Sequence, residues 1–295
     1  MKRVCRRKIQ IDALKICYTV VHPYHYERLC ELDYGESYEM QEFMLCRTEG
    51  RYYDNIYIIR LFDGDGIIDY GQVKFNICHG DRDSNTHTNG QVKVWMSLNN
   101  AVLYSQDFYY LDYIATSLGF EAHNITSLDL CLDTPFNVSK TLKTLIRDKS
   151  VTTILNGKRI VDRDADRPEI IFTQTGSLNK FKYLTVNIKQ KNALRDKSKG
   201  ISLTTYDKQA EIRNASEKFY ILDYYGNPNK LFRTEVHLNN EDVKSYLDNN
   251  DIEFTPLILL DEALLESMFF HYLDSLIRFK SKSKDVCWQH LLGRS

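Results

Sequence analysis

Apolar and polar residues alternate along much of this chain, as they do in strands that bury one face. The alternating segments, in chain order, are residues 9–20, 42–46, 57–62, 71–78, 91–98, 127–133, 169–173, 201–206 and 231–238. Because every second side chain of a strand points to the same side, each segment can place its apolar residues against a core. The pattern predicts a protein built on β-sheet, with an exposed loop at residues 80–90 and a turn or hairpin at 156–168.

Residues that commonly cap helices predict where helices lie between these strands. The predicted starts are Ser105 for a helix over 106–118, Ser139 for a helix to Arg147, and Thr255, followed by Pro256, for a helical region to Arg278. Gly119 follows the first of these helices and suits the left-handed residue that ends many helices. The acidic stretch 27–42 is expected to form irregular helix.

One arrangement occurs twice along the chain. Residues 92–98 lead into Asn99-Asn100 and a helical stretch, and residues 232–238 lead into Asn239-Asn240 and the predicted helix 241–247. Two matches can arise by chance, but they suggest a duplicated strand–helix module around one sheet. We therefore expect an α+β fold in which helices pack on a mainly antiparallel sheet.

The expected division of the chain places one large domain at residues 1–250. A helical C-terminal extension, with a basic tail at Lys280, Lys282 and Lys284, is expected over residues 251–295. A chain of 295 residues with 43% hydrophobic residues is long enough to bury a substantial core without covalent staples.

The cysteines and the apolar runs indicate a soluble protein of a reducing cytoplasm. The seven cysteines are odd in number and include no Cys-x-x-Cys pair, so a disulfide framework is not expected. The basic N-terminus has no apolar run behind it, unlike a secretory signal. No stretch approaches the roughly 20 apolar residues of a membrane span.

Charge is distributed unevenly, although the formal net charge is only −1. Residues 179–213 contain nine Lys or Arg against three Asp or Glu. The cations that precede Tyr206 in this segment are Lys180, Lys182, Lys189, Lys191, Arg195, Lys197 and Lys199. They can form a solvated loop or a site for a phosphate backbone, whose affinity would then fall steeply with salt.

The strand over residues 127–133 offers two carboxylates on one face. Its period places Leu128, Leu130 and Leu132 on one side and Asp129, Cys131 and Asp133 on the other. Two aspartates on one strand face repel each other, so we expect a positively charged side chain close to them. They can be surface or ion-pair residues, or they can be hard oxygen ligands for Mg²⁺ or Mn²⁺.

A second polar face is predicted on the strand over residues 231–238. Arg233, Glu235 and His237 share one side of it. These residues can form a surface ladder of charges. They can equally supply a phosphate-binding arginine, a carboxylate ligand and a proton carrier.

The third polar face lies where the strand over residues 201–206 passes into the segment Asp207-Lys208-Gln209-Ala210-Glu211. Thr204, Tyr206 and Lys208 share that face. Tyr206 is one of 20 tyrosines and can simply pack in the core. Beside a metal ion on a basic surface, its phenol could instead attack a phosphodiester bond and hold the product as a phosphotyrosine.

The order of these motifs resembles a known family. The chain has a Leu-Asp-Leu-x-x-Asp strand, a basic region, a Tyr-Asp-Lys-x-x-Glu segment, and an Arg-x-Glu-x-x-Leu strand followed by a helix. This order is similar to the plasmid rolling-circle replication initiators of the Rep-trans type. It is more distantly similar to filamentous-phage replication endonucleases and to replication-initiation factors of conjugative elements. The likeness runs from about Gln91 to Leu247, and a strand at residues 11–18 is similar too.

The resemblance implies that Tyr206 is the nucleophile and that Asp129 and Glu235 bind the catalytic Mg²⁺ or Mn²⁺. Asp133, Glu211 and Arg233 match motif positions whose roles are left open, with Asp133 a possible further metal ligand and Arg233 a catalytic cation. The candidates for activating the phenol are Lys208 and His237. The chain departs from the plasmid proteins in a longer basic segment before Tyr206 and a shorter part after the Arg-x-Glu strand, so origin recognition need not be shared.

This resemblance implies a site-specific endonuclease that nicks single-stranded or supercoiled DNA at an origin and leaves a 3′-hydroxyl. The implied partners are DNA, a host helicase, a polymerase and a second copy of the chain. The histidines argue against the His-metal relaxase class, because His22 and His25 have the wrong spacing and His87 stands alone. A non-catalytic DNA-binding regulator and a nuclease that uses water remain open as alternatives.

Overall fold

A computed structural model shows an α+β protein. It describes residues 8–64, 66–77, 87–88, 91–105, 109–161, 167–175, 183–195 and 200–293. The chain divides into two compact units. Unit 1 contains residues 1–11, 129–242 and 261–295, and unit 2 contains residues 12–128 and 243–260. The domain boundary at residue 250 that we expect from the sequence stays a prediction.

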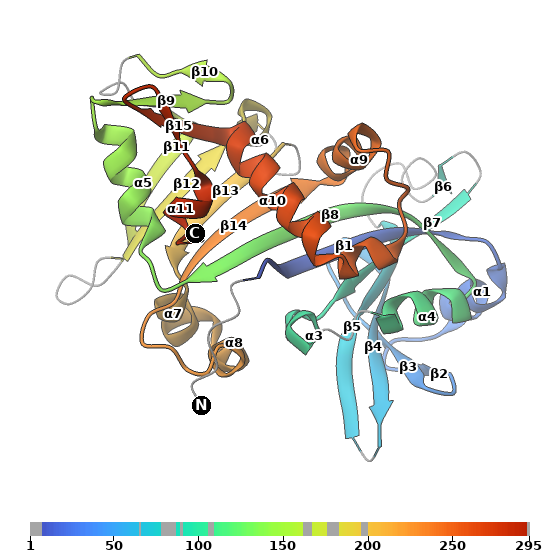
Figure 1. The fold of residues 1–295 in the computed structure, drawn as a ribbon. Helices are drawn as coiled ribbons and strands as arrows, with labels where there is room; N and C mark the ends of the chain where they lie inside the picture. Colours follow the sequence, from blue (N-terminus) through green and yellow to red (C-terminus); the bar gives the residue numbers. More distant parts are fainter. Residues whose placement is uncertain are drawn as a thin grey trace. The chain divides into compact units, whose positions relative to one another are not determined.

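Unit 2 is built on a sheet with helices at its connections (Figure 1). Its elements are most of β1 (Gln10–Val20), α1 (Pro23–Glu31), β2 (Ser37–Glu39), β3 (Phe43–Thr48), β4 (Tyr53–Asp63), β5 (Gly66–Ile77), β6 (His87–Thr88), β7 (Gln91–Leu98), α3 (Asn100–Ser105), α4 (Tyr109–Ser117), the first part of β8 (Phe120–Thr134), most of α9 (Asn240–Asn249), and η2 (Pro256–Leu260). The strand order is β8-β1-β7-β5-β4-β3-β2, and β6 pairs with β7. The neighbouring strands pair antiparallel, for example β1 with β7 and β7 with β5.

Unit 1 holds the second part of β8 and the remaining elements. They are α5 (Val138–Arg147), β9 (Val151–Leu155), β10 (Lys158–Arg159), β11 (Ile170–Thr175), β12 (Tyr183–Lys189), α6 (Lys191–Arg195), β13 (Ser202–Asp207), α7 (Lys208–Glu211), the π-helical turn η1 (Ile212–Ser216), α8 (Phe219–Tyr224), β14 (Phe232–Asn239), the start of α9 (Asn240–Asn249), α10 (Glu262–Leu276), β15 (Ile277–Ser281), β16 (Lys284–Val286) and α11 (Trp288–Leu291). Its main sheet has the order β11-β12-β13-β14-β8, and a small sheet has the order β10-β9-β15-β16.

The two units repeat one topology. In each unit, a first strand is followed along the chain by a helix and later by four strands of the main sheet. The last of these four strands lies next to the first strand in the sheet. The order of neighbouring strands is therefore β1-β7-β5-β4-β3 in unit 2 and β8-β14-β13-β12-β11 in unit 1. A helix then begins at an Asn-Asn pair. Asn99 accepts a hydrogen bond from the Ala101 N–H, and Asn239 accepts one from the Asp242 N–H. The duplicated strand–helix module expected from the sequence is therefore present.

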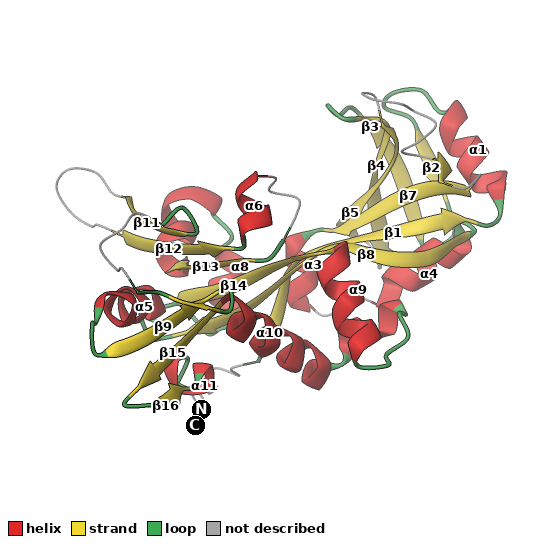
Figure 2. Ribbon diagram, turned by 90° about the horizontal axis from the view of Figure 1, so that it is seen from above, coloured by secondary structure: helices red, strands yellow, loops and turns green. Residues whose placement is uncertain are grey.

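The core of unit 1 lies between its main sheet and two helices. Helix α5 packs on β12, β13 and β14, and α10 packs on β13 and β14. Figure 2 shows both helices on the same side of these strands. The strand residues on that side, among them Leu203, Thr205 and Val236, are fully buried. The polar residues of β13 and β14 lie on the opposite side. The apolar residues of each strand pack against the helices, and the face with the polar residues is therefore the one that is not covered by them.

Some helix starts differ from the sequence-based expectation. Ser105 ends α3 instead of capping a following helix. The side chain that caps α5 is Asn137, which accepts a hydrogen bond from the Lys140 N–H at 2.9 Å. Ser139 is buried, and its hydroxyl bonds the hydroxyl of Thr205. Both capping serines were therefore misassigned, because a propensity for helix ends does not show which polar residue has a tertiary partner.

The C-terminal region contains strands as well as helix. Helix α10 begins at Glu262 and is capped by Asp261, whose carboxylate accepts hydrogen bonds from the Ala263 and Leu264 N–H groups. Residues 277–286, expected as helix end and basic tail, form the hairpin β15–β16, and β15 pairs antiparallel with β9. Gly119 ends α4 as predicted: its φ is +74°, and a Cβ there would lie 2.6 Å from the His22 Cβ.

In the part of the chain that the structure describes, no helix is both long and apolar enough to cross a membrane.

Candidate active site

The three polar strand faces predicted from the sequence lie on three neighbouring strands, β13, β14 and β8. The register places Ser202 across from His237, Thr204 across from Glu235, and Tyr206 across from Arg233. Tyr206, Glu235, His237 and Asp129 are each half-buried, whereas their strand neighbours Leu203, Val236 and Leu238 are fully buried. The period of two residues in each strand therefore gathers the predicted side chains on one partly open face.

Tyr206 and Glu235 are in direct contact. The Tyr206 hydroxyl donates a hydrogen bond to Oε2 of Glu235 at 3.2 Å. We expected Glu235 to serve as a metal ligand and did not foresee this bond. No sequence signal points to it, because it depends on the pairing of two strands that lie about 30 residues apart in the chain. The carboxylate is placed to receive the phenolic proton.

His237 and Asp129 form the second pair on this face. Nδ1 of His237 lies 2.5 Å from Oδ1 of Asp129. This hydrogen bond raises the pKa of His237, and the negative charges of Asp129, Glu235 and Asp242 raise it further against the opposing effect of burial. The imidazolium form is therefore favoured. With Nδ1 directed at Asp129, Nε2 is the ring nitrogen left to meet a substrate.

Asp133 and Arg233 lie on the same strand faces but are fully buried. Arg233 donates from Nε to Oδ1 of Asp133 at 2.8 Å and from its terminal nitrogen to Oδ2 at 2.6 Å. Neither side chain is exposed. Both oxygens of Asp133 are thus engaged by one guanidinium, which is the positive partner that the two-aspartate strand required.

Lys208 lies at the start of α7, directly after the Tyr206 strand. Its ammonium pairs with Glu211 at 2.8 Å and sits 5.7 Å from the centre of the Tyr206 ring. Asp207 caps α7 by accepting from the Ala210 N–H, and burial raises the pKa of the Asp207 carboxyl. The Tyr-Asp-Lys-x-x-Glu segment thus folds as a strand end with a capped helical turn, and Lys208 and Glu211 are partners in it.

Asp129 and Glu235 offer hard oxygen donors from neighbouring strands of this face. Among the described residues, no group of three or more His, Cys, Asp or Glu is arranged to hold a metal ion. Mg²⁺ is commonly bound by one or two carboxylates, with water and substrate phosphates completing its shell. Asp129 and Glu235 fit that donor set, whereas Asp133 is engaged with Arg233.

The predicted basic segment is described only in part. Lys189 is half-buried on β12 and Lys191 is exposed at the start of α6. The other five predicted cations lie outside the described residues or, for Arg195, have a side chain outside them. The structure adds strand β12, which the sequence does not predict because the lysine-rich segment around it suggests a loop. Asn187 on β12 accepts a hydrogen bond from the Thr204 hydroxyl at 2.9 Å.

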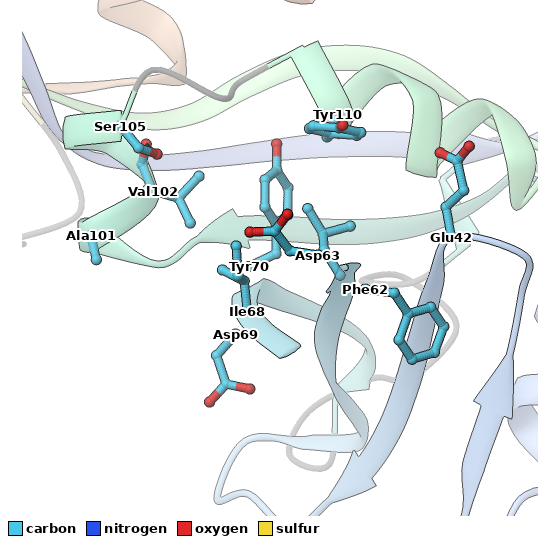
Figure 3. Close-up of a pocket in the computed structure, with 11 residues that line it drawn as sticks. Glu42, Phe62, Asp63, Ile68, Asp69, Tyr70, Ala101, Val102, Ser105 and Tyr110 are labelled. Atoms are coloured by element: carbon cyan, nitrogen blue, oxygen red, sulfur yellow. Dashed lines mark hydrogen bonds between the residues drawn. The ribbon is translucent and has the colours of Figure 1, made fainter. Parts of the chain in front are cut away.

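A separate cavity of about 630 Å³ lies within unit 2 (Figure 3). Its lining includes the acidic residues Glu42, Asp63 and Asp69 together with Tyr70 and Tyr110. None of the predicted site residues lines it. Its carboxylates disfavour a phosphate ligand, so the sheet face of unit 1 remains the candidate active site.

Comparisons with known proteins support the fold that these elements define. No family model matches the chain, and no curated protein matches it. Among solved structures, the chain is similar to a rolling-circle replication initiator protein from Geobacillus stearothermophilus. The match has a TM-score of 0.51 and 15% sequence identity, and it covers 93% of this chain and 87% of that one. The chain therefore has the fold of a rolling-circle replication initiator, as its motif order suggested.

Proposed function

We propose that this protein is a metal-dependent tyrosine endonuclease that nicks one DNA strand to start rolling-circle replication or the transfer of a mobile element. The observation that carries the proposal is the hydrogen bond from the Tyr206 hydroxyl to Glu235 on an open sheet face. The Asp129–His237 pair lies on the neighbouring strands of that face. The similarity to a replication initiator supports it at the level of the fold.

The chemistry assigned to these residues is a transesterification. Oη of Tyr206 forms a bond to the scissile phosphorus, the bond from phosphorus to O3′ breaks, and a 5′-phosphotyrosine and a free 3′-hydroxyl result. An ordinary phenol has a pKa of about 10 and needs a base at neutral pH. Oε2 of Glu235 accepts the phenolic proton, and protonated His237 donates a proton to the leaving O3′.

Mg²⁺ or Mn²⁺ is the proposed cofactor, with Asp129 and Glu235 as its protein ligands, and it would offset the negative charge of the phosphate. The buried ion pair of Arg233 and Asp133 supports the strands that carry the site, and the ion pair of Lys208 and Glu211 stabilises the helical turn that follows Tyr206. Because the phosphotyrosine retains the energy of the broken bond, the strand can later be rejoined.

The proposed partners follow from this reaction. DNA at an origin or nick site, single-stranded or supercoiled, is the substrate, and Lys189 and Lys191 belong to the segment proposed to bind its backbone. A host helicase and a polymerase would use the nicked strand and its 3′-hydroxyl. A homodimer is the proposed form on DNA, and the cytoplasm is the proposed compartment.

The decisive experiment incubates the purified protein with Mg²⁺ or Mn²⁺ and DNA from its own genetic neighbourhood, both supercoiled and single-stranded. A denaturing gel then detects protein-linked fragments. We expect an adduct with the wild type and none with Tyr206→Phe, because phenylalanine lacks the attacking oxygen. Tyr224→Phe is the matched control, since Tyr224 is a partly exposed tyrosine of α8 that the proposed chemistry does not use.

The other outcomes each identify a different activity. Cleavage without an adduct would assign the protein to nucleases that use water. DNA binding without cleavage, equal in the wild type and Tyr206→Phe, would favour a regulatory DNA-binding protein. Asp129→Asn should abolish cleavage and spare DNA binding, whereas loss of both would give Asp129 a structural role.

A further inference from the structure

The sheet of unit 2 has positions equivalent to those of the candidate active site. Aligning the two Asn-Asn pairs matches β7 to β14, so that Trp95 corresponds to Glu235 and Ser97 to His237. The strand registers agree with this match. In unit 2, Lys74 pairs with Trp95 and Gln72 pairs with Ser97. At the equivalent positions of unit 1, Thr204 pairs with Glu235 and Ser202 pairs with His237.

The equivalent residues have a different chemistry in unit 2. Where unit 1 has the buried Arg233–Asp133 pair, unit 2 has Lys93, whose ammonium donates to the Thr19 hydroxyl at 2.6 Å. The first strand contributes Lys15, across from Ser97, where unit 1 has Asp129 reaching His237. Asp129 and Glu235 of unit 1 thus correspond to a lysine, Lys15, and an aromatic residue, Trp95, in unit 2. This face cannot bind a metal as unit 1 would, and it suits an anionic ligand.

Lys15, Tyr53, Lys74 and Trp95 form one cluster, which we call the Trp95 surface. All four side chains are half-buried. The Lys15 ammonium lies 5.5 Å from the Tyr53 ring centre and 5.7 Å from that of Trp95, and it donates to the Tyr53 hydroxyl at 3.1 Å. The two rings lie 5.8 Å apart at a tilt of 56°. Cation and rings hold each other in place before any ligand arrives.

Several lysines of unit 2 lie close enough together to affect the titration of their neighbours. Burial, and then the charge of Lys15, lower the pKa of Lys74. Lys93 and Lys244 lower the pKa of the nearby His123 in addition to burial. Within the described ranges, none of the lysines at positions 15, 74, 93 and 244 forms a salt bridge with a carboxylate. Like charges brought together in this way favour a polyanion as ligand.

We propose that the Trp95 surface is a second nucleic-acid site, which binds single-stranded DNA by stacking a base on Trp95 and by contacting phosphates with Lys15 and Lys74. Single strands present unpaired bases and a charged backbone together, and proteins bind them with aromatic rings beside cations. Double-stranded DNA offers no free base face, and an acidic protein segment gives the rings no such partner. The choice of DNA rests on the proposed function, but the site is separate from Tyr206.

The chain provides its own probe for this site. It has two tryptophans, Trp95 and Trp288. Trp288 is 2% exposed, and its indole N–H donates to the Ile277 carbonyl, so a ligand at the surface does not reach it. The experiment titrates the full chain with an oligothymidylate of about 12 nucleotides, within the usual size of a single-strand site, and follows tryptophan fluorescence.

We expect the oligonucleotide to quench the wild type and Tyr206→Phe equally, and to leave the fluorescence of Trp95→Phe unchanged. The double variant Lys15→Gln/Lys74→Gln should bind about tenfold more weakly, and its salt slope should be shallower by about 1.4 for two lost phosphate contacts. Arg28→Gln is the matched control. Arg28 is an exposed cation of α1, and α1 packs on the other face of the sheet, where Tyr57 bonds the Leu29 carbonyl.

The results separate this inference from the proposed function. A tyrosine adduct in the nicking assay with no quenching of Trp95 would overturn the inference and leave the endonuclease in place. Quenching that Trp95→Phe abolishes, without any adduct, would establish the single-strand site and remove the endonuclease. Quenching by polyglutamate but not by oligothymidylate would assign the surface to an acidic protein and overturn the inference.

Discussion

At the scale of single residues, the two charged pairs of the unit 1 face differ in burial and therefore in role. Asp133 and Arg233 have no exposed side-chain surface, whereas Asp129 and His237 are 22% and 33% exposed. When one residue of a buried ion pair is removed, the other charge is left in the core without a partner, and the fold is strongly destabilised. A partly exposed pair can meet a ligand, which is why we assign chemistry to Asp129 and His237 and a supporting role to Asp133 and Arg233.

Arg233→Met should destabilise the protein by about 3 to 5 kcal/mol, because it leaves the buried Asp133 carboxylate without a partner. Urea unfolding followed by circular dichroism measures this change. The control is Arg28→Met, which removes an exposed ion pair with Glu31 and should cost about 0.5 kcal/mol or less. Adding Asp133→Leu to Arg233→Met should restore part of the stability, and no recovery would argue that the charge pair is not the cause.

His237 should make stability depend on pH. Its folded pKa is raised above the ordinary value of about 6.5, chiefly by the bond to Asp129. The stabilisation is therefore fully present below about pH 6.5 and is lost as the pH rises through the folded pKa. The difference in unfolding free energy between wild type and His237→Gln should be larger at about pH 5.5 than at about pH 9.

The control for this experiment is His290→Gln, since His290 is exposed on α11. Because the side chain is exposed, the substitution should change the unfolding free energy by about 0.5 kcal/mol or less. Asp129→Asn should bring the His237 titration, followed by NMR, back toward the ordinary range. If the pKa of His237 is the same in Asp129→Asn and the wild type, the Asp129 bond is not its cause.

At the scale of elements, α5 shows how a local signal and a tertiary contact compete. Asn137 and Ser139 both have side chains that can cap a helix, and only two residues separate them. Asn137 caps because its carbonyl oxygen meets the Lys140 N–H. Ser139 is instead drawn into the core by the Thr205 hydroxyl of β13. The helix therefore begins earlier than residue 139 and is tied to the strand that carries Tyr206.

Asn137→Ala should destabilise unit 1 by about 1 kcal/mol, because the first turn of α5 loses its side-chain acceptor. Thermal or urea unfolding measures the loss. Asn137→Asp keeps an acceptor at the same position and should differ from the wild type by only a few tenths of a kcal/mol. Equal losses in the two variants would show that the amide's packing, and not the cap, stabilises the helix.

At the scale of the whole molecule, the last 35 residues belong to the unit that holds the candidate site. Helix α10 packs on β13 and β14, and β15 pairs with β9. Met268, Phe269, Leu273 and Phe279 from this region are buried to within 1% of their surface. Because these residues pack in the core of unit 1, we expect that cutting the chain at residue 250 would expose that core.

A fragment of residues 1–250 should therefore lose the cooperative unfolding of unit 1. Circular dichroism melting and proteolysis of the fragment and the full chain test this expectation. We expect protease cleavage near Tyr206 in the fragment but not in the full chain, because β13 and β14 lose the helix that covers them. A fragment that melts within a few degrees of the full chain would support the boundary first expected at residue 250.

The sequence by itself determined the strands with strong alternation, the duplicated module and the polar faces of β8, β13 and β14. These are local properties, because the period of a strand assigns each side chain to a face without reference to the rest of the fold. The left-handed Gly119 was equally predictable from local geometry.

Only the tertiary structure decided which polar residues meet. Asp129 and Asp133 are alike in sequence, but one reaches a half-exposed histidine and the other a buried arginine. Three features depend on partners that are distant in the chain. They are the hydrogen bond between Tyr206 and Glu235, the bond of Ser139 to Thr205, and the pairing of β15 with β9. Such partners are set by strand order and by burial, and neither is encoded in any one stretch of residues.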